Sequence, residues 1–497
     1  MKHKMLSMVP ADLSVSILLC LILMGCDIGV PIGVLGNGET NYDPFQVLNV
    51  FPDNNLRIAI YERIILARPD STLRGATVEY ISTRDLQNIV YLNLNNRSIG
   101  SLEGIQFCPN VTSLDISGNP ITSLSPVAGL KKMTALTMSS CDLEDISSLS
   151  SDTALVKLVA DQNRISDISA LSNLRHLKYV NLAMNRITRV SAFEQMQYLE
   201  SLYLWINTIE DISPLRNNQS MSILDVHGNR IKSLPDLSGC KALTQLNASN
   251  NQIAEIGDIK NLEHLQAIYL GTNHIVKISS ISDLPQLTVL SLTGNSITSI
   301  SGLSNVSSLE HLDLYGNSAT DISFISGMPN LKLIWLGENK PQDFSPLYNL
   351  KKVEYLDLRH TNLRNISFLS GLTSLKNVDI GGNSVTSINE IASLTNLEFL
   401  QVAGNLLSDI AVVTNFKKLT YLDASGNRLK NITVLKELQY LTYLDLNSNL
   451  IEDLTPIIEC QGMRINSYFN IRGNQLSGTA RNEQVPILQA RGVYVVL

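Results

Sequence analysis

The chain has 497 residues, of which 44% are hydrophobic and 17% are charged, and its formal net charge is −7. This composition is that of a folded protein and excludes a disordered one. Because the chain is acidic and has no cluster of Lys and Arg, we do not expect nucleic acid as its partner.

Residues 1–25 have the features of a secretory signal peptide. Lys2 and Lys4 precede an apolar run at residues 13–24, which is too short to span a bilayer easily. Residues 23–26, Leu-Met-Gly-Cys, resemble a bacterial lipobox. The resemblance implies lipid attachment at Cys26 and an exported protein anchored at the cell envelope, at the surface or in the periplasm. An ordinary signal peptide cleaved nearby is the alternative.

Residues 26–88 are predicted to form a flexible tether followed by an N-terminal cap. The tether, residues 26–45, is rich in Gly and polar residues. In the cap, residues 46–88, Asp53 is a candidate N-cap residue for a helix. Leu56, Ala59, Ile60 and Ile64 follow at helical spacing.

A repeat of 22 residues occupies residues 89–480. Its copy at residues 287–300, LTVLSLTGNSITSI, reads L-x-x-L-x-L-x-x-N-x-I-x-x-I. Steps of 22 from Asn295 give 17 positions without a slip, and 14 of them are Asn. These ladder positions are Arg97, Asn119, Cys141, Asn163, Asn185, Asn207, Asn229, Asn251, Asn273, Asn295, Asn317, Asn339, Thr361, Asn383, Asn405, Asn427 and Asn449.

The repeat predicts a solenoid of short strands. Leu290 and Leu292 alternate with Ser291 and Thr293, as in a half-buried strand. An amphipathic helix is excluded because the leucines are two residues apart. Asn295 follows in a turn, where its amide can donate to and accept from buried backbone groups. One repeat cannot bury its apolar edge, so the repeats must stack.

The repeats resemble those of bacterial internalins. Residues 165–171 (ISDISAL) and 209–215 (IEDISPL) are similar to that family's I-x-D-I-x-P-L segment, and residues 51–56 (FPDNNL) resemble the start of its cap. The resemblance covers residues 45–480. It implies an α/β repeat, a leucine-rich-repeat solenoid with a curved parallel sheet on the concave face, short 3-10 or irregular segments on the convex face, and an N-terminal helical cap.

Departures from the repeat predict local features. Cys108, Cys240 and Cys460 lie 11 residues after ladder positions, where other repeats have Leu, so we expect buried thiols. Thr361 is expected to loosen the ladder locally. The step from Asn449 to Asn474 is 25 residues, and the extra residues are placed in 460–470. Residues 481–497 are expected to form a C-terminal capping strand.

The sequence predicts no enzyme, cofactor or metal site, because it lacks HExxH, GxSxG, a phosphate loop and a metal-spaced Cys/His cluster. Acids recur four residues before the ladder. We interpret them as solvated strand surface, and cation binding by neighbouring pairs stays open. These acids are Asp115, Asp225, Asp313, Asp357, Asp379, Asp423 and Asp445.

Aromatic side chains on the concave face are the candidate ligand-binding residues. The solvent-facing positions lie two, four and six residues before each ladder residue, and both tryptophans fall on them. Exposed aromatics on a rigid sheet are favoured binding anchors; surface aromatics without a function are the alternative. The candidates are Tyr203, Trp205, Tyr269, His311, Tyr315, Trp335, Tyr355 and His360.

Two functions are compatible with these features. The first is a lipid-anchored leucine-rich-repeat protein that recognises a protein or a glycan through its concave face, in adhesion or host interaction. This function follows from the resemblance to internalins, which engage host surface proteins. The second is a periplasmic structural or regulatory scaffold without a host ligand.

Overall fold

The computed structural model describes residues 45–46, 50–67, 80–81, 83–278 and 281–497. The chain divides into two compact units, Met1–Pro44 and Phe45–Leu497. The first unit lies outside the described residues, and with it the signal peptide, Cys26 and the tether up to residue 44. Within the described ranges, no helix is both long enough and apolar enough to cross a bilayer.

The cap is tied to the first repeat by Asp53. It contains strand β1 (Phe45–Gln46), helix α3 (Asn54–Ala67), strand β2 (Tyr80–Ile81) and helix α4 (Thr83–Gln87), and β1 pairs with β2 in antiparallel fashion. One oxygen of Asp53 accepts the backbone N–H groups of Asn55 and Leu56, which confirms the N-cap. Its other oxygen accepts from Gly100 and Ser101 at 2.8 and 3.1 Å. The predicted helix face, from Leu56 to Ile64, is buried.

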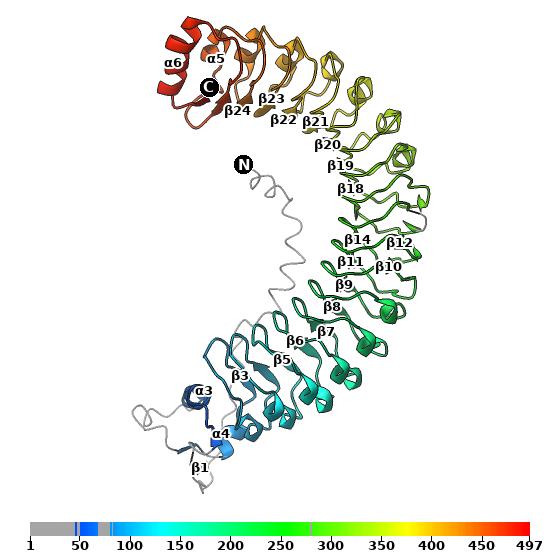
Figure 1. The fold of residues 1–497 in the computed structure, drawn as a ribbon, viewed down its shortest axis with the longest axis vertical. Helices are drawn as coiled ribbons and strands as arrows, with labels where there is room; N and C mark the ends of the chain where they lie inside the picture. The colour runs from blue at the N-terminus through cyan, green and yellow to red at the C-terminus, as the bar shows by residue number, and fades with distance from the viewer. Residues whose placement is uncertain (1–44, 47–49, 68–79, 82, 279–280) are drawn as a thin grey trace. The chain divides into compact units, whose positions relative to one another are not determined.

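The repeats form a parallel sheet of 19 short strands, which confirms the predicted solenoid. The strands lie on the concave side of the repeat unit (Figure 1). In order of pairing they are β3 (Tyr91–Asn93), β4 (Ser113–Asp115), β5 (Ala135–Thr137), β6 (Lys157–Val159), β7 (Tyr179–Asn181), β8 (Ser201–Tyr203), β9 (Ile223–Asp225), β11 (Gln245–Asn247), β14 (Ala267–Tyr269), β16 (Val289–Ser291), β18 (His311–Asp313), β19 (Leu333–Trp335), β20 (Tyr355–Asp357), β21 (Asn377–Asp379), β22 (Phe399–Gln401), β23 (Tyr421–Asp423), β24 (Tyr443–Asp445), β25 (Tyr468–Asn470) and β26 (Tyr494–Val496).

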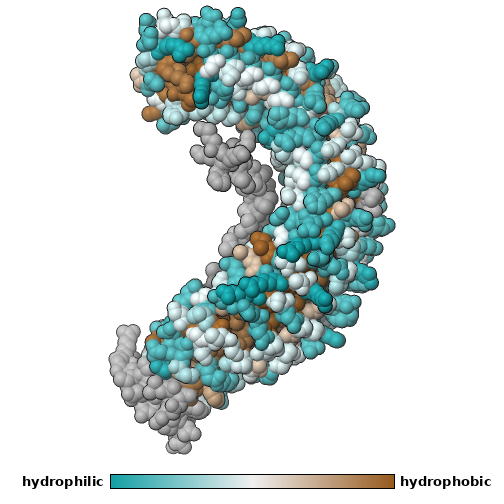
Figure 2. All heavy atoms as spheres, in the orientation of Figure 1, coloured by the Kyte–Doolittle hydropathy of each residue, from teal (hydrophilic) through white to brown (hydrophobic). Residues whose placement is uncertain are grey.

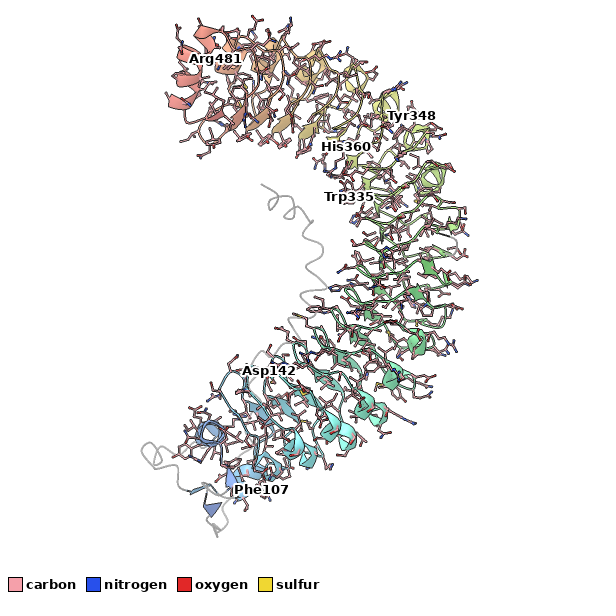
Figure 3. The ribbon with its side chains drawn as sticks, in the orientation of Figure 1. Phe107, Asp142, Trp335, Tyr348, His360 and Arg481 are labelled. Carbon is pink, nitrogen blue, oxygen red and sulfur yellow. The ribbon has the colours of Figure 1, made fainter. Side chains whose placement is uncertain are left out.

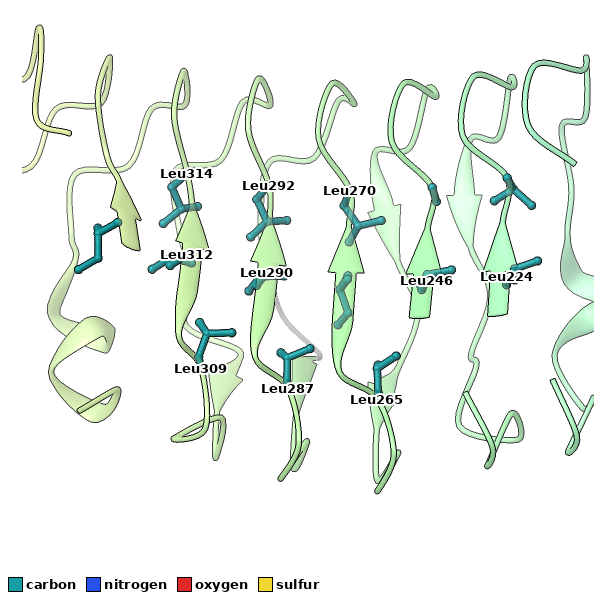
Figure 4. Close-up of a cluster of buried hydrophobic side chains, with 14 of the residues drawn as sticks. Leu224, Leu246, Leu265, Leu270, Leu287, Leu290, Leu292, Leu309, Leu312 and Leu314 are labelled. Atoms are coloured by element: carbon teal, nitrogen blue, oxygen red, sulfur yellow. The ribbon is translucent and has the colours of Figure 1, made fainter. Parts of the chain in front are cut away.

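The sequence period sets the register of the sheet. Leu290 pairs with Ile268 on one side and with Leu312 on the other, one period away in each direction. The buried leucines of neighbouring repeats therefore stack in columns under the sheet (Figure 4). Because each repeat packs against the next, the core is continuous along the repeat unit.

The ladder residues join neighbouring repeats through hydrogen bonds. Asn295 Nδ2 donates to the carbonyls of Leu292 and, in the preceding repeat, Leu270, at 2.9 and 3.0 Å, and Oδ1 accepts from Ile275 N–H at 3.0 Å. At Thr361 the hydroxyl donates to Leu358 O. Cys141 is buried on the ladder, and its thiol contacts Ile116 O. Cys141 therefore keeps the side-chain bond to the preceding repeat. The Thr361 hydroxyl bonds instead to its own repeat and to Asn383 of the next one, which agrees with the local loosening expected there.

The convex side carries short 3-10 turns (Figure 1). In many repeats an Asp, Asn or Ser four residues after the ladder starts the turn, as where Asp211 Oδ1 accepts Ser213 N–H at 2.8 Å. The turns are η4 (Ile105–Phe107), η5 (Ser125–Gly129), η6 (Ser147–Ser151), η7 (Ser169–Asn173), η8 (Ser191–Phe193), η9 (Ser213–Leu215), η10 (Ser323–Gly327), η11 (Ser345–Leu347), η12 (Ser367–Gly371), η13 (Asn389–Ile391), η14 (Ala411–Asn415) and η15 (Thr433–Glu437).

The repeats between residues 233 and 304 differ on this side, where they form two small parallel sheets. Glu255 and Lys277 stand where Asp211 starts a turn, and their longer side chains do not cap the local backbone as Asp does. The strands are β10 (Ser233–Leu234), β12 (Glu255–Ile256), β13 (Ile259–Lys260), β15 (Ile281–Ser282) and β17 (Leu303–Ser304).

The last repeat is closed by a helical segment as well as by a strand. Helix α5 (Thr455–Glu459) is followed by the inserted residues, and Asn474 accepts from Ile451 as the period requires. Residues 481–497, expected as a strand alone, contain most of a π-helical turn η16 (Ala480–Gln484), helix α6 (Val485–Ala490) and strand β26. Figure 2 shows hydrophobic surface at this end, where Ile465, Ile487 and Leu497 are exposed.

The thiols at the substituted Leu positions are buried, as predicted. Cys108, Cys240 and Cys460 are free and inaccessible, and burial raises the pKa of Cys108 to about 12. They pack in the core as small apolar groups.

Candidate binding surface on the concave face

Seven of the eight predicted aromatic or histidine candidates lie on the strand face. Tyr203, Trp205, Tyr269, His311, Tyr315, Trp335 and Tyr355 are all partly exposed. His360 is the exception, because it is the residue immediately before the ladder position. Its backbone has φ 54°, as required in the turn, and its imidazole lies over Gly382 of the next repeat. Figure 3 shows Trp335 and His360 on the concave side and Tyr348 on the convex side.

The first group of aromatic residues, the N-terminal cluster, spans strands β7 to β9. The Trp205 ring stacks on His227 with a centroid distance of 5.4 Å and an interplanar angle of 7°. Tyr179 and Tyr203 pack at 5.5 Å. His227 Nδ1 lies 2.7 Å from Asp225 Oδ1, which fixes the imidazole against the tryptophan. The cluster is therefore ordered before any ligand arrives.

Two exposed apolar side chains lie beside this cluster. Met184 and Ile206 occupy the turn position before the ladder, where the backbone φ is 52° for both. Gly228 and Gly294 hold the same position in other repeats. A left-handed conformation is costly for a β-branched residue, yet Ile206 is 47% exposed and so gains little from burial. Strain at an exposed apolar residue is typical of binding surfaces.

The second group, the central cluster, spans strands β18 to β20. Trp335 and Tyr355 pack with ring centroids 5.0 Å apart. The Arg359 guanidinium lies 4.9 Å from the Tyr315 ring centroid, although these residues are two repeats apart. Gly337 lies between them, and a Cβ there would stand 3.0 Å from the Tyr315 ring. The glycine thus permits this cation–π contact.

Two buried carboxylates hold Arg359. Its Nε and Nη2 donate to Asp357 Oδ2 at 2.9 and 2.6 Å, and Asp379 Oδ2 lies 3.8 Å from Nε. Burial, and then the neighbouring Asp357 charge, raise the pKa of Asp379 to about 6. Burial also raises the pKa of Tyr355 to about 12. Arg359 is therefore a neutralised, fixed part of the cluster.

Tyr269 lies on the face between these groups, on β14, and His311 lies on β18 at the edge of the central cluster. Burial raises the pKa of Tyr269 and lowers the pKa of His311. Between the two clusters the strand face also carries small residues, which include Gly271, Ser291 and Thr293. The predicted candidates on the strand face therefore fall mainly into two clusters with a flatter region between them.

The interpretation of the recurring acids as solvated surface is wrong for three of them. Asp357, Asp379 and Asp445 are buried, with exposed fractions of 0%, 4% and 8%. Each carboxylate accepts the backbone N–H of the residue two positions later, as where Asp445 Oδ1 accepts from Asn447 at 2.9 Å. The same bond occurs at the other acids of the column. These acids therefore hold the end of each strand, a role that Asn fills in other repeats.

A third aromatic group, the ring row, was missed by the sequence analysis. Five rings stack across strands β22 to β26, with successive centroids 4.1, 4.1, 4.7 and 5.9 Å apart. The first four rings stand six residues before a ladder residue, and the fifth pairs in register with Tyr468, so aromatic recurrence at that position was the available signal. The rings belong to Phe399, Tyr421, Tyr443, Tyr468 and Tyr494.

No group of three or more His, Cys, Asp or Glu in the described part of the chain is arranged to hold a metal ion. The neighbouring acids Asp357 and Asp379 share Arg359 instead. The Arg359 guanidinium therefore takes the place that a cation would occupy between these two carboxylates.

Family comparisons agree with the repeat architecture. The family described as Leucine Rich repeats (2 copies) matches residues 241–286, 285–326, 351–393 and 417–459, and the family described as Leucine Rich repeat matches residues 107–124. These matches and the structure of the repeat unit together define a leucine-rich-repeat solenoid. No curated protein matches it.

Solved structures with the same fold come from several sources. A leucine-rich-repeat protein of Leptospira interrogans is 20% identical, with a TM-score of 0.62 over 84% of this chain and 97% of that one. The functional domain of InlJ of Listeria monocytogenes is 20% identical, with a TM-score of 0.61 over 83% and 82%. The plant peptide hormone receptor RGFR1, in complex with RGF2, is 21% identical, with a TM-score of 0.61 over 84% and 81%. At these identities the similarity concerns the fold.

Proposed function

We propose that this protein is an exported, lipid-anchored recognition protein of the bacterial cell envelope that binds a protein ligand through its concave face. The observation that carries the proposal is the N-terminal cluster, where exposed Met184 and Ile206 in left-handed turns flank the stacked Trp205. Natural sequences usually place Gly or Asn at such turns. An exposed Ile there lowers stability without improving the core, so binding is the reason that we infer for it.

A protein ligand is favoured over a glycan. Sugars bind aromatic residues through open ring faces, but one face of Trp205 is covered by His227, and the Trp335 ring packs against Tyr355. Apolar side chains such as Ile206 suit the apolar core of a protein interface. A similar fold binds a peptide hormone in the plant receptor. Adhesion to a host protein is the biological role that fits a surface location, whereas a periplasmic location favours the scaffold.

The binding proposal is tested on arrays of purified extracellular proteins and of purified glycans, probed with the chain from Cys26 onward. We expect a protein ligand whose affinity falls by roughly 30-fold or more in a Trp205→Ala/Trp335→Ala variant, because even one anchor of this kind contributes about 2 kcal/mol or more. A Tyr198→Ala/Tyr348→Ala variant is the matched control, since these tyrosines are exposed and lie outside the strand face. Equal affinity of the parent and the tryptophan variant, or no ligand on either array, would contradict the proposal.

The envelope location needs two further measurements. Metabolic labelling with palmitate should mark the parent but not a Cys26→Ala variant, and label in the variant would exclude attachment at Cys26. Protease added to intact cells should digest a surface-displayed chain, whereas full protection would favour the periplasmic scaffold.

A further inference from the structure

The concave face of the repeats carries more acids than bases. At the three solvent-facing positions of each repeat, eight acids stand against three bases, Lys157, Arg359 and Arg472. The face therefore has a net charge of −5, out of −7 for the whole chain. A partner of opposite charge is attracted to such a face. The acids are Asp115, Asp161, Asp225, Asp313, Asp357, Asp379, Asp423 and Asp445.

Two of these acids are left without a basic partner beside the ring row. Among the described residues, no ion pair joins Asp423 or Asp445 to a Lys, Arg or His. Their hydrogen bonds go to neutral groups, which include Ser425 Oγ at 2.6 Å from Asp423 and Asn470 Nδ2 at 2.9 Å from Asp445. Burial, followed by the nearby Asp445 charge, raises the pKa of Asp423. The pair, in which Asp445 is buried and Asp423 is partly exposed, thus carries negative charge without a counter-ion among the described residues.

The ring row limits what can lie beside these acids. Tyr421 and Tyr443 are stacked on both faces, so only ring edges and hydroxyl groups are open to a ligand. A sugar cannot stack there, but the aliphatic stem of a Lys or Arg can lie along the edges while its charged head reaches the acids. The first four rings cover three strand steps, about 14 Å, or roughly four extended residues.

We propose that the concave face of strands β22 to β25 binds a basic, extended segment of a protein partner, with Lys or Arg side chains directed to Asp423 and Asp445 and their stems against the ring row. The proposal rests on the proposed function, because it specifies the partner chemistry of the same face. On the side of this area opposite the ring row, Ala403 and Ser425 have small side chains that leave room for a bound segment.

The test is a selection of random 12-residue peptides displayed on phage against the immobilised chain from Cys26 onward. We expect the selected peptides to be enriched in Lys and Arg. A synthetic copy of the strongest binder should lose roughly tenfold or more in affinity for an Asp423→Asn/Asp445→Asn variant, and its binding to the parent should weaken with added salt. Asn at this position preserves the fold, because Asn181 and Asn247 make the same strand-end bond in other repeats.

An Asp115→Asn/Asp161→Asn variant removes the same number of charges from the N-terminal repeats and is the matched control. Its affinity for the peptide should stay within about twofold of the parent. Selected peptides without basic residues, or equal affinity of the parent and the Asp423→Asn/Asp445→Asn variant, would overturn the inference. That result would leave the proposed function intact if the tryptophan variant still lost its array ligand. Conversely, basic peptides that need Asp423 and Asp445 would uphold the inference even if the tryptophan variant bound normally.

Discussion

Replacing Asp152 with Asn should stabilise the repeat unit at neutral pH. Asp152 lies 11 residues after Cys141, at the core position that Leu occupies in other repeats, and it is 2% exposed. Both of its carboxylate oxygens are buried without a hydrogen-bond partner. Burial raises its pKa from the ordinary value of 3.8 to about 6. The folded state therefore favours the protonated acid.

The magnitude and the pH window follow from this shift. A rise of about two pKa units corresponds to about 3 kcal/mol of destabilisation once the carboxylate is charged. The loss begins as the pH rises above the unfolded value near 4 and is complete above the folded value of about 6. An Asn at this position avoids the destabilisation because its side chain is neutral. Asn218 already occupies the same place in its repeat, where Nδ2 donates to Met196 O at 2.8 Å.

Urea unfolding of the parent and the Asp152→Asn variant at pH 4 and pH 7.5 measures the effect. We expect the variant to be more stable by about 1–3 kcal/mol at pH 7.5 and nearly equal to the parent at pH 4. A variant that is less stable at pH 7.5, or a difference of the same size at both pH values, would refute the assignment of a buried, unpaired carboxylate.

Three further substitutions test the repeat architecture by urea unfolding. Asn295→Ala removes the side-chain hydrogen bonds to buried backbone groups of three residues, so we expect the free energy of unfolding to fall by about 3 kcal/mol. A fall of under about 1 kcal/mol would argue against a stabilising ladder. Ile206→Gly should stabilise the chain by up to about 1 kcal/mol and should weaken ligand binding; destabilisation would refute the inferred strain. Thr361→Asn should change stability by less than about 1 kcal/mol, because Pro341 lacks the N–H that an Asn would accept; a large gain would count against this pairing.

The repeat architecture followed from the sequence because its determinants recur. The spacing of Leu290 and Leu292 determines which side chains of the strand are buried, and Asn295 determines the turn. Every copy of the repeat therefore predicts the same local structure. The extended convex segments were not foreseen, since they depend on single substitutions such as Lys277 at a turn-starting position. The C-terminal helix α6 lies after the last repeat, where the period no longer informs the fold.

The candidate site was only partly predictable. Strand phase placed Trp205 and Trp335 on the concave face correctly, but the contact of Arg359 with Tyr315 across Gly337 depends on side-chain rotamers that the period does not encode. His360 lies on the concave side as expected, but in the turn, one residue outside the strand-face pattern.

Two features of the concave face, the recurring acids and the ring row, became clear only from the structure. The acids were interpreted as solvated because Asp is common at this place in such repeats, whereas the strand-end bond made by Asp445 gives its carboxylate a backbone partner. The ring row depends on the recurrence of Phe and Tyr at one position of successive repeats, which is a weaker signal in the sequence than the two tryptophans.

Hydroxyl-radical footprinting tests the central claim of concave-face recognition most directly. The full chain from Cys26 onward is oxidised with and without the protein ligand found on the arrays, and the modified side chains are read by mass spectrometry. The account predicts that the ligand protects Met184 and Trp205 and leaves Tyr198 and Tyr348 as reactive as before. Protection confined to Tyr198 and Tyr348, with Met184 and Trp205 unchanged, would contradict it.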